Sequence, residues 1–221
     1  MCTVIVKTGR PLTLMGVRDE FADRPWEGPG EHWPEHPGVV GGRDLKAGGT
    51  WLAVDPARRR AAALLNGHGR AAPETTKISR GDLPLLAVGA DDLPDVDLPD
   101  VDLTRYDPFH LVLADPARAR LFSWDGERLS TSEVPDGTSM IVNTGLNPEH
   151  ARVAAYRPRF ESSADWRELI AAAPSADPSA LIIRDVTPDG RVFASLSVML
   201  VTLAPEGVTY DFTDLTADRD G

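Results

Sequence analysis

Short runs in which hydrophobic and polar residues alternate dominate the chain, and this pattern is typical of β-strands. The runs at 3–7 and 12–17 are separated by a turn of Thr, Gly, Arg and Pro, so they predict a β-hairpin. Further strands are predicted at 50–55, 61–66, 109–115, 119–125, 127–134, 138–143, 191–203 and 207–215. Their short connections favour antiparallel pairing.

The hydrophobic period changes to that of a helix in residues 147–156. This segment places Asn147 where an N-cap belongs, Pro148 at the first helical position and Glu149 in the first turn. Each of these residue types is preferred at its position, so the spacing predicts a helix that begins after Asn147.

A second helix is predicted over residues 162–173, which begin with Ser163 and Asp165 and then repeat apolar residues at helical spacing. A shorter helix is predicted after Ser79, which serves as its cap. Residues 21–46 are rich in Pro, Gly, Trp and charge and show neither period, so they predict an ordered loop.

Many antiparallel strands with two or three helices predict an α+β fold built from packed layers. At 221 residues the chain is long enough to bury one sizeable core. We therefore expect residues 1–221 to form a single domain.

Charge and composition narrow the classes of partner. The net charge of −11 and the scarcity of Lys and Arg clusters disfavour binding to a phosphate backbone, so nucleic acid is not expected as a partner. Part of this charge lies in the Asp-rich stretch at 91–102, which repeats Leu-Pro-Asp-Val-Asp and predicts a solvated surface excursion.

The chain start and the apolar runs give expectations about location. The first residues lack the basic region and long apolar run of a signal peptide, and the apolar stretch at 192–204 is too short to cross a bilayer as a helix. A single cysteine also cannot form an internal disulfide. We expect a soluble, cytoplasmic protein without integral membrane insertion.

That single cysteine is Cys2. If the initiator Met1 is removed, Cys2 carries both a thiol, with a pKa of about 8.5, and a free α-amine, with a pKa of about 7.7–8.0. The amine can then take the thiol proton, so one residue supplies both nucleophile and base. The alternative is that Cys2 is a small apolar residue in an edge strand.

Several motifs after the initial Met-Cys support the first alternative. They are GVRDEFADRPW at 16–26, GGRDLKAGGTWLAV at 41–54, ALLNGHGR at 63–70, ISRGDL at 78–83, FHLVLAD at 109–115 and IVNTGL at 141–146. In this order they resemble the NRDE family, also called the transport and Golgi organization protein 2 family. The resemblance implies a fold like that of N-terminal-nucleophile hydrolases, a four-layer αββα sandwich of two antiparallel sheets with Cys2 at a strand start.

The resemblance also implies site residues besides Cys2. Arg18 would lie beside the thiol and lower its pKa, and a guanidinium there also suits an anionic substrate. Asp19 could hold the α-amine, but neighbouring residues of a strand point to opposite faces, so Arg18 and Asp19 cannot both face the thiol without a bulge or a strand end. Asn66 and Asn143 match two family asparagines that could donate to a developing oxyanion. Alternatively, each asparagine caps the turn before a glycine.

Three positions depart from the pattern of such relatives. Val17 stands where the family motif begins with Asn, and Phe21 stands where related cysteine hydrolases have an Asp. The segment at 193–197 contains no Arg, although many relatives have one before the penultimate strand. The first departure removes a hydrogen-bonding group beside the site, the second leaves the role of Asp19 open, and the third removes a cation.

Other conspicuous residues have structural interpretations. The glycines of AGGTW at 47–51 let the backbone pass close to a neighbouring segment. The tryptophans at 26, 33 and 51 either line a pocket mouth or pack the Pro-rich loop down. His32 and His36 have a spacing compatible with a metal, but no third ligand is evident in the sequence, which favours a solvated loop.

Two function hypotheses follow. The first is an N-terminal cysteine hydrolase that cleaves a linear amide of a small molecule and requires no cofactor. The second is a non-enzymatic haem or lipid-related carrier on the same fold, in which haem would be the ligand, because members of this family have been linked to haem trafficking and lipid homeostasis. A fold without activity is a third possibility. The sequence does not indicate an oligomeric state or a specific substrate.

Overall fold

The computed structural model describes residues 3–90, 101–171 and 173–216. In this part of the chain the strands form two antiparallel sheets, with few helices, so the predicted α+β class is confirmed. The first sheet contains β1 (Thr3–Lys7), β2 (Leu12–Phe21), β10 (Thr138–Val142), β11 (Arg184–Val186), β12 (Val192–Ala204) and β13 (Gly207–Asp214). Its order is β10-β1-β2-β12, and both β11 and β13 pair with β12.

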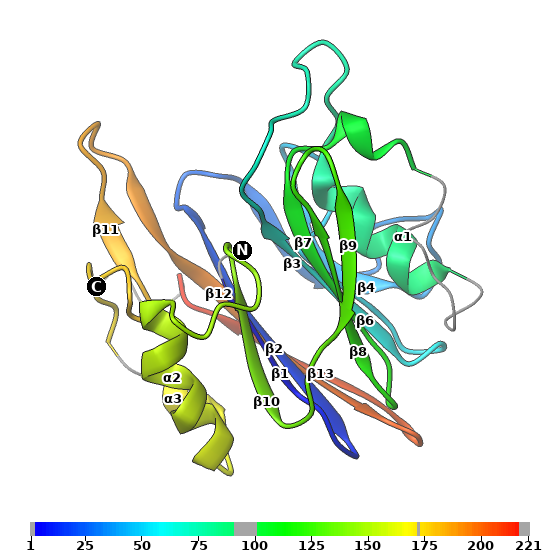
Figure 1. The fold of residues 1–221 in the computed structure, drawn as a ribbon, viewed down its shortest axis with the longest axis vertical. Coiled ribbons are helices and arrows are strands. Elements are labelled where there is room, and N and C mark those ends of the chain that lie inside the picture. Colours follow the sequence, from blue (N-terminus) through cyan, green and yellow to red (C-terminus); the bar gives the residue numbers. More distant parts are fainter. Residues whose placement is uncertain (1–2, 91–100, 172, 217–221) are drawn as a thin grey trace.

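The second sheet follows chain order from β3 to β9. Its strands are β3 (Trp26–Gly30), β4 (Val40–Asp44), β5 (Leu52–Asp55), β6 (Arg60–Asn66), β7 (Phe109–Ala114), β8 (Ala119–Trp124) and β9 (Leu129–Glu133). Figure 1 shows this sheet on one side of the molecule and the first sheet on the other.

Helices cover the outer faces of both sheets. The helix α1 (Leu83–Gly89) contacts β5, β6 and β7, whereas α2 (Ala151–Ser162) contacts β10 (Figure 1). The remaining helical elements are the short α3 (Arg167–Ile170) and the single 3₁₀ turns η1 (Arg80–Asp82) and η2 (Leu103–Arg105). None of the helices in the described ranges is long and apolar enough to cross a membrane.

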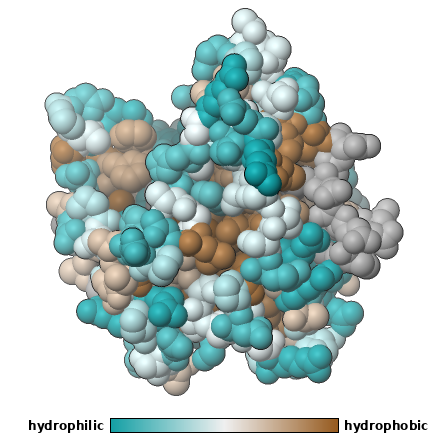
Figure 2. Space-filling view, viewed as in Figure 1, coloured by the Kyte–Doolittle hydropathy of each residue, from teal (hydrophilic) through white to brown (hydrophobic). Residues whose placement is uncertain are grey.

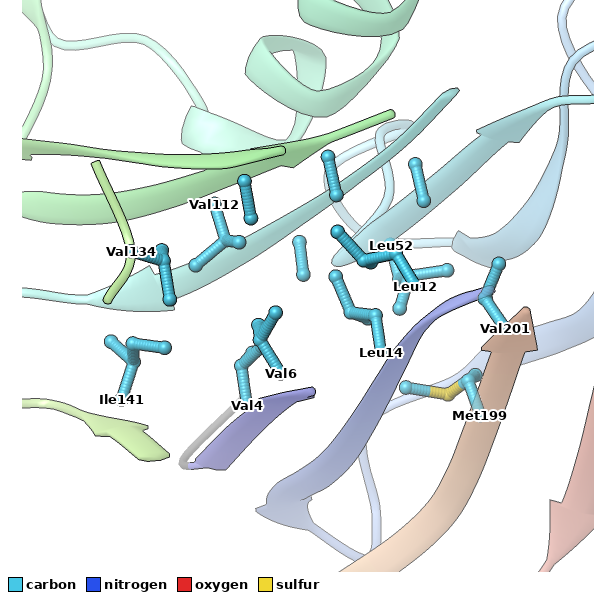
Figure 3. Close-up of a cluster of buried hydrophobic side chains, with 14 of the residues drawn as sticks. Val4, Val6, Leu12, Leu14, Leu52, Val112, Val134, Ile141, Met199 and Val201 are labelled. Carbon is cyan, nitrogen blue, oxygen red and sulfur yellow. The ribbon is translucent and has the colours of Figure 1, made fainter. Parts of the chain in front are cut away.

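The main core lies between the two sheets. Val4, Val6 and Leu14 from the first sheet face Leu52 and Val112 from the second, and all five side chains are almost fully buried (Figure 3). Burying each such side chain stabilises the fold by about 1.5–3 kcal/mol. The alternate residues Ile5, Met15 and Val17 face the other way, toward α2 and α3. Period-two alternation thus assigns every residue of these strands to one of two faces.

The predicted hairpin at 3–7 and 12–17 is confirmed, as are the predicted strand pairs along the chain. The prediction of a loop at 21–46 is wrong, because this segment contains β3 and β4. Neither strand alternates cleanly. The strand β3 lies at the sheet edge, tolerates a proline, and has a register break between Glu27 and Gly30.

The predicted start of the helix after Asn147 is wrong. The helix α2 begins at Ala151, and the side chain of His150 rather than Asn147 caps it by accepting from the amide of Arg152. Asn147 instead accepts a hydrogen bond from the amide of Glu149 in the preceding turn. The Asn-Pro-Glu pattern therefore forms an Asx turn, which favours the same residue types as a helix start. The true N-cap, His150, lies three residues after the predicted one.

The second predicted helix is much shorter than expected. Ser163 is the C-cap of α2, and α3 spans only four residues after Trp166. The predicted cap at Ser79 is confirmed, because its hydroxyl accepts from the amide of Gly81 at the start of η1. Residues 91–100 of the Asp-rich stretch lie outside the described residues.

Candidate functional site

Cys2 lies outside the described residues. The candidate site described below consists of residues on the strands around its neighbour Thr3. Thr3 begins β1 and pairs with Val17 of β2 on one side and with Val142 of β10 on the other. The next residues at this end of the sheet are Arg18 and Asn143. Two of the predicted site residues thus flank the start of β1 on both sides.

Arg18 points into the space between the sheets. Its Cζ lies 4.2 Å from the ring centroid of Trp51 and 5.6 Å from that of Trp26. The residue is only 3% exposed, and its Nη1 has no hydrogen-bond partner in the part of the chain that the structure describes. Burial lowers the pKa of Arg18 to about 10, against the opposing effect of the carboxylates of Glu20 and Asp44. The guanidinium of Arg18 therefore packs against aromatic rings and has no carboxylate bound to its Nη1 among the described residues.

A cavity of about 360 Å³ opens in front of Arg18 between the ends of the two sheets. Asn66, the last residue of β6, lines it from the second sheet and is exposed. Arg18 and Asn66 are thus brought to one cavity, although 48 positions separate them in the sequence. Figure 2 shows hydrophobic side chains at the surface near the middle of this view, and further hydrophobic patches at its upper left and upper right.

Charged side chains form much of the cavity wall. Arg24 donates to Asp44 over 2.6 Å, and Lys77 lies 2.8 Å from Asp107. Arg80 also lines the cavity, and its Nη1 donates to the carbonyl of Pro108. Burial lowers the pKa of Arg80, and the negative charge of Asp107 opposes this shift.

Asp19 lies on the opposite face of β2, as the strand alternation predicts. Its Oδ1 accepts from Ser195 over 2.6 Å and its Oδ2 lies 3.2 Å from Nη1 of Arg152. The same Nη1 donates to the hydroxyl of Thr3. Asp19 therefore belongs to a buried network between the first sheet and α2, away from Arg18. A β-bulge in β12 at Leu196 sets Ser195 opposite Asp19 in this arrangement.

Asn143 lies in the turn that follows β10. Its backbone oxygen accepts from Nε2 of His110 at 3.2 Å, while Nδ1 of His110 lies 2.7 Å from the hydroxyl of Ser123. A carbonyl can only accept, so Nε2 carries the proton and Nδ1 of the neutral ring accepts from Ser123. The turn that presents Asn143 is thus anchored to β7 and β8 of the second sheet.

Asn143 also lines a second cavity, of about 260 Å³, together with Asp19 and Arg152. Its Oδ1 has no hydrogen-bond partner among the described residues. The four predicted site residues within the described range therefore divide into two pairs. Arg18 and Asn66 line the cavity between the sheets, and Asp19 and Asn143 line the one at the start of α2.

The departures from the family pattern have structural counterparts. Val17 is fully buried in the apolar cluster under α2 and α3. Phe21 packs edge-on against Phe193 and lies under the guanidinium of Arg191. In the segment at 193–197, the hydroxyl of Ser195 donates a hydrogen bond to Asp19. Each position is thus integrated into packing or hydrogen bonding in this chain.

The other conspicuous residues divide between packing and the cavity. Trp33 donates to the carbonyl of Gly48 and so fastens the loop, whereas Trp26 and Trp51 enclose Arg18. His32 lies 2.8 Å from the carbonyl of Gly28. Within the described ranges, no group of three or more potential ligands could hold a metal ion.

Sequence reasoning missed four residues of this region: Arg80, His110, Arg152 and Ser195. Arg80 lies within the quoted ISRGDL motif and His110 within the quoted FHLVLAD motif, so these motifs are the sequence signals that could have found them. Arg152 and Ser195 lie in none of the quoted motifs, and their partner Asp19 comes from a distant segment, so no local pattern indicates them.

Comparisons with known proteins agree with the motifs. A search among curated proteins gave no match. A family model described as Transport and Golgi organisation 2 matches residues 1–186, which is most of the chain and includes every predicted site residue. The chain therefore belongs to the Transport and Golgi organisation 2 family.

Proposed function

We propose that this protein is an N-terminal cysteine hydrolase that cleaves a linear amide, with Cys2 as the nucleophile after removal of Met1. The observation that carries the proposal is the double pairing of Thr3, with Val17 on one side and Val142 on the other. One further step of these two ladders leads to Arg18 and Asn143, so a nucleophile at position 2 would have a guanidinium and an amide as neighbours.

Strand alternation supports the same placement. Val4 and Val6 of β1 face the space between the sheets, on the side where Arg18 lies. A Cys2 side chain that continued this alternation would face the cavity that Arg18 and Asn66 line. The arrangement of two facing sheets with helices on both outer sides also fits the four-layer architecture of N-terminal-nucleophile hydrolases.

The reaction would proceed in two steps. The α-amine takes the thiol proton, Sγ attacks the amide carbon, and the carbonyl π electrons move to oxygen, where the side-chain amide of Asn66, which lines the same cavity as Arg18, donates a hydrogen bond. The C–N bond then breaks as the amine returns the proton to the leaving nitrogen. Water hydrolyses the resulting thioester, releases a carboxylic acid and restores the thiol.

The residues would divide the work. Arg18 stabilises the thiolate, because a cation beside a thiol lowers its pKa. Arg152 and Asp19 act as positioning residues, since Arg152 binds the hydroxyl of Thr3 and so fixes the residue next to Cys2. A donor such as an oxyanion-stabilising amide contributes about 3–4 kcal/mol to transition-state binding.

The proposal is tested by three measurements on the full-length protein. Intact mass is expected to show loss of Met1. The rate of iodoacetamide alkylation against pH is expected to show a thiol pKa below about 8.5, raised by about one unit or more in Arg18→Gln. A panel of fluorogenic acyl-aminocoumarin amides is expected to be cleaved by the wild type but not by Cys2→Ala.

Two outcomes would overturn this function. Retention of Met1 removes the amine that serves as the base. A thiol with an ordinary pKa, unchanged in Arg18→Gln, removes the activated nucleophile. Haem or lipid binding that persists in Cys2→Ala, together with no cleavage by the wild type, would favour the carrier hypothesis instead.

A further inference from the structure

The cavity between the sheets has an unusual balance of charge. Its wall carries four basic side chains, Arg18, Arg24, Lys77 and Arg80, and three acidic ones, Glu20, Asp44 and Asp107. The wall is therefore positive by one charge in a protein whose net charge is −11. Such a local excess attracts anions against the field of the whole chain.

Two of the four cations already have carboxylate partners. Arg24 pairs with Asp44 and, at 3.9 Å, with Glu20, and Lys77 pairs with Asp107 and with Glu74 outside the cavity. Arg18 and Arg80, in contrast, have no carboxylate within ion-pair distance in the described ranges. Two guanidinium groups without a direct ion pair in the described ranges thus share one cavity.

Arg18 in particular is prepared for an external anion. It is buried, its Nη1 lacks a hydrogen-bond partner among the described residues, and Trp51 lies against its guanidinium face. Stacking on an aromatic ring fixes the plane of a guanidinium and leaves the N–H edge as the recognition surface. A buried donor without a partner destabilises the free protein, so a ligand that accepts a hydrogen bond from it binds more favourably.

We propose that this cavity binds a carboxylate group, held by Arg18 and Arg80, of a small molecule that also contains an amide. A guanidinium fork matches a carboxylate in a bidentate fashion. A single negative charge balances the wall, whereas a phosphate dianion would leave it negative beside Glu20 and Asp44. The exposed amide of Asn66 lines the same cavity and can pair with the amide of the ligand.

The volume of the cavity fits such a ligand. About 360 Å³ lies within the range of small-molecule sites and exceeds what a lone ion needs. An N-acylated amino acid has the required chemistry, because its carboxylate lies one carbon from its amide nitrogen. As a statement about the substrate this inference depends on the proposed function, but as a statement about binding it does not.

The test uses a matched pair of probes, N-octanoylglycine and the uncharged N-octanoylglycinamide. Binding is measured by calorimetry and by tryptophan fluorescence on full-length Cys2→Ala, in which no turnover can occur by the proposed route. We expect the carboxylate probe to bind about 10-fold or more tightly than the amide, because the charge-assisted hydrogen bonds are lost with the carboxylate. Added salt should weaken only the charged probe.

Variants assign the effect to the two guanidinium groups. Arg18→Gln and Arg80→Gln, each in the Cys2→Ala background, are expected to lower the affinity for N-octanoylglycine about 10-fold and to leave that for the glycinamide unchanged. Asn66→Asp, at an exposed position, should weaken the charged probe by repulsion even if the arginine variants fold poorly. The matched control is Arg157→Gln, an arginine of α2 that does not line the cavity.

The outcomes separate this inference from the proposed function. Equal binding of the two probes, or inorganic phosphate that competes as tightly as N-octanoylglycine, would overturn the carboxylate site. If the wild type cleaves amides without preference for the charged probe, the hydrolase function stands, but the carboxylate is not part of its substrate. Charge-selective binding to Cys2→Ala without any cleavage by the wild type would support the site and remove the hydrolase.

Discussion

Nη1 of Arg152 lies 3.2 Å from Oδ2 of Asp19, and this ion pair joins α2 to β2 with both side chains buried. The Arg152 guanidinium also donates to the hydroxyl of Thr3 and to the carbonyl of Pro178. Asp19 completes the network through Ser195. The start of β1 is therefore fixed by a helix that follows it by almost 150 positions, in addition to its strand pairing.

Removing one partner of this pair should destabilise the fold strongly. In Arg152→Met the carboxylate of Asp19 stays buried without its cation, which typically costs about 3–5 kcal/mol. We expect a loss in that range in the free energy of unfolding, measured by urea denaturation. The double variant Asp19→Asn with Arg152→Met should recover part of the loss, because no uncompensated charge remains.

The surface pair of Arg70 and Glu127 supplies the control. Both side chains are largely exposed, 75% and 69%, at a separation of 3.4 Å. Arg70→Met is expected to change the free energy of unfolding by less than about 1 kcal/mol. Equal losses in the two arginine variants would show that burial does not set the strength of the Asp19 pair.

Strand alternation was sufficient to predict how β2 divides its residues. Placing Arg18 and Asp19 on opposite faces requires only the period of a strand, and the structure confirms it. The partners of Asp19 could not be predicted in this way. Arg152 reaches it from a helix whose docking depends on the whole apolar cluster around Phe160 and Trp166.

Strands with a weak hydrophobic pattern and the starts of helices are harder to predict from the sequence. The strands β3 and β4 are short, rich in glycine and partly exposed, so their hydrophobic pattern is weak although their backbone pairs. The start of α2 was misplaced because Asn147 and His150 can each end a turn with a side-chain hydrogen bond. Tertiary packing chose between them, and local preference alone does not encode that choice.

Replacing Arg18 should affect stability differently from replacing Arg152. Burial lowers the pKa of Arg18 to about 10, which means that the folded state disfavours its charged form. At pH 7 the arginine is protonated in both folded and unfolded states, so the folded state carries the full penalty; it is released only as pH rises above 10. We expect Arg18→Met to lower the free energy of unfolding at pH 7 by less than about 1 kcal/mol, or to raise it.

Arg24 offers a comparison within the same cavity. It donates to Asp44 over 2.6 Å, so Arg24→Met removes a charge-assisted hydrogen bond and should cost about 1 kcal/mol or more. Urea denaturation at pH 7 compares the two variants directly. A larger loss in Arg18→Met than in Arg24→Met would contradict the view that Arg18 is kept for ligand binding at the expense of stability.

Gly49 should not tolerate a side chain. A Cβ at this position would lie 2.3 Å from the backbone carbon of Gly81, because the two segments pass each other closely and the amide of Thr50 donates to the carbonyl of Gly81. Gly49→Ala must push the segment around Arg80 away, and overpacking of this kind costs about 1–3 kcal/mol. Gly28→Ala, where a Cβ meets nothing within 4 Å, is the control and should cost far less. Thermal unfolding of both variants measures the difference, and equal melting temperatures would contradict it.

His110 should make stability depend on pH in the mildly acidic range. Burial lowers its pKa below 6.5, although the hydrogen bond to the carbonyl of Asn143 raises it, and the nearby His68 lowers it further. The unfolded chain therefore binds more protons than the folded one between the folded pKa and 6.5, so stability rises with pH across that window. The contribution is complete above pH 6.5 and is lost as the pH falls toward the folded value.

The variant His110→Gln should flatten this dependence, because glutamine does not titrate. Urea denaturation at pH 7.5 and 5.5 is expected to show a smaller drop for His110→Gln than for the wild type and for the control His36→Gln. The slope that remains includes His150, whose pKa burial also lowers. Since His110 anchors the turn at Asn143, amide hydrogen exchange at residues 143–145 should also accelerate in the variant. An unchanged pH dependence together with unchanged exchange would show that His110 does not hold this turn.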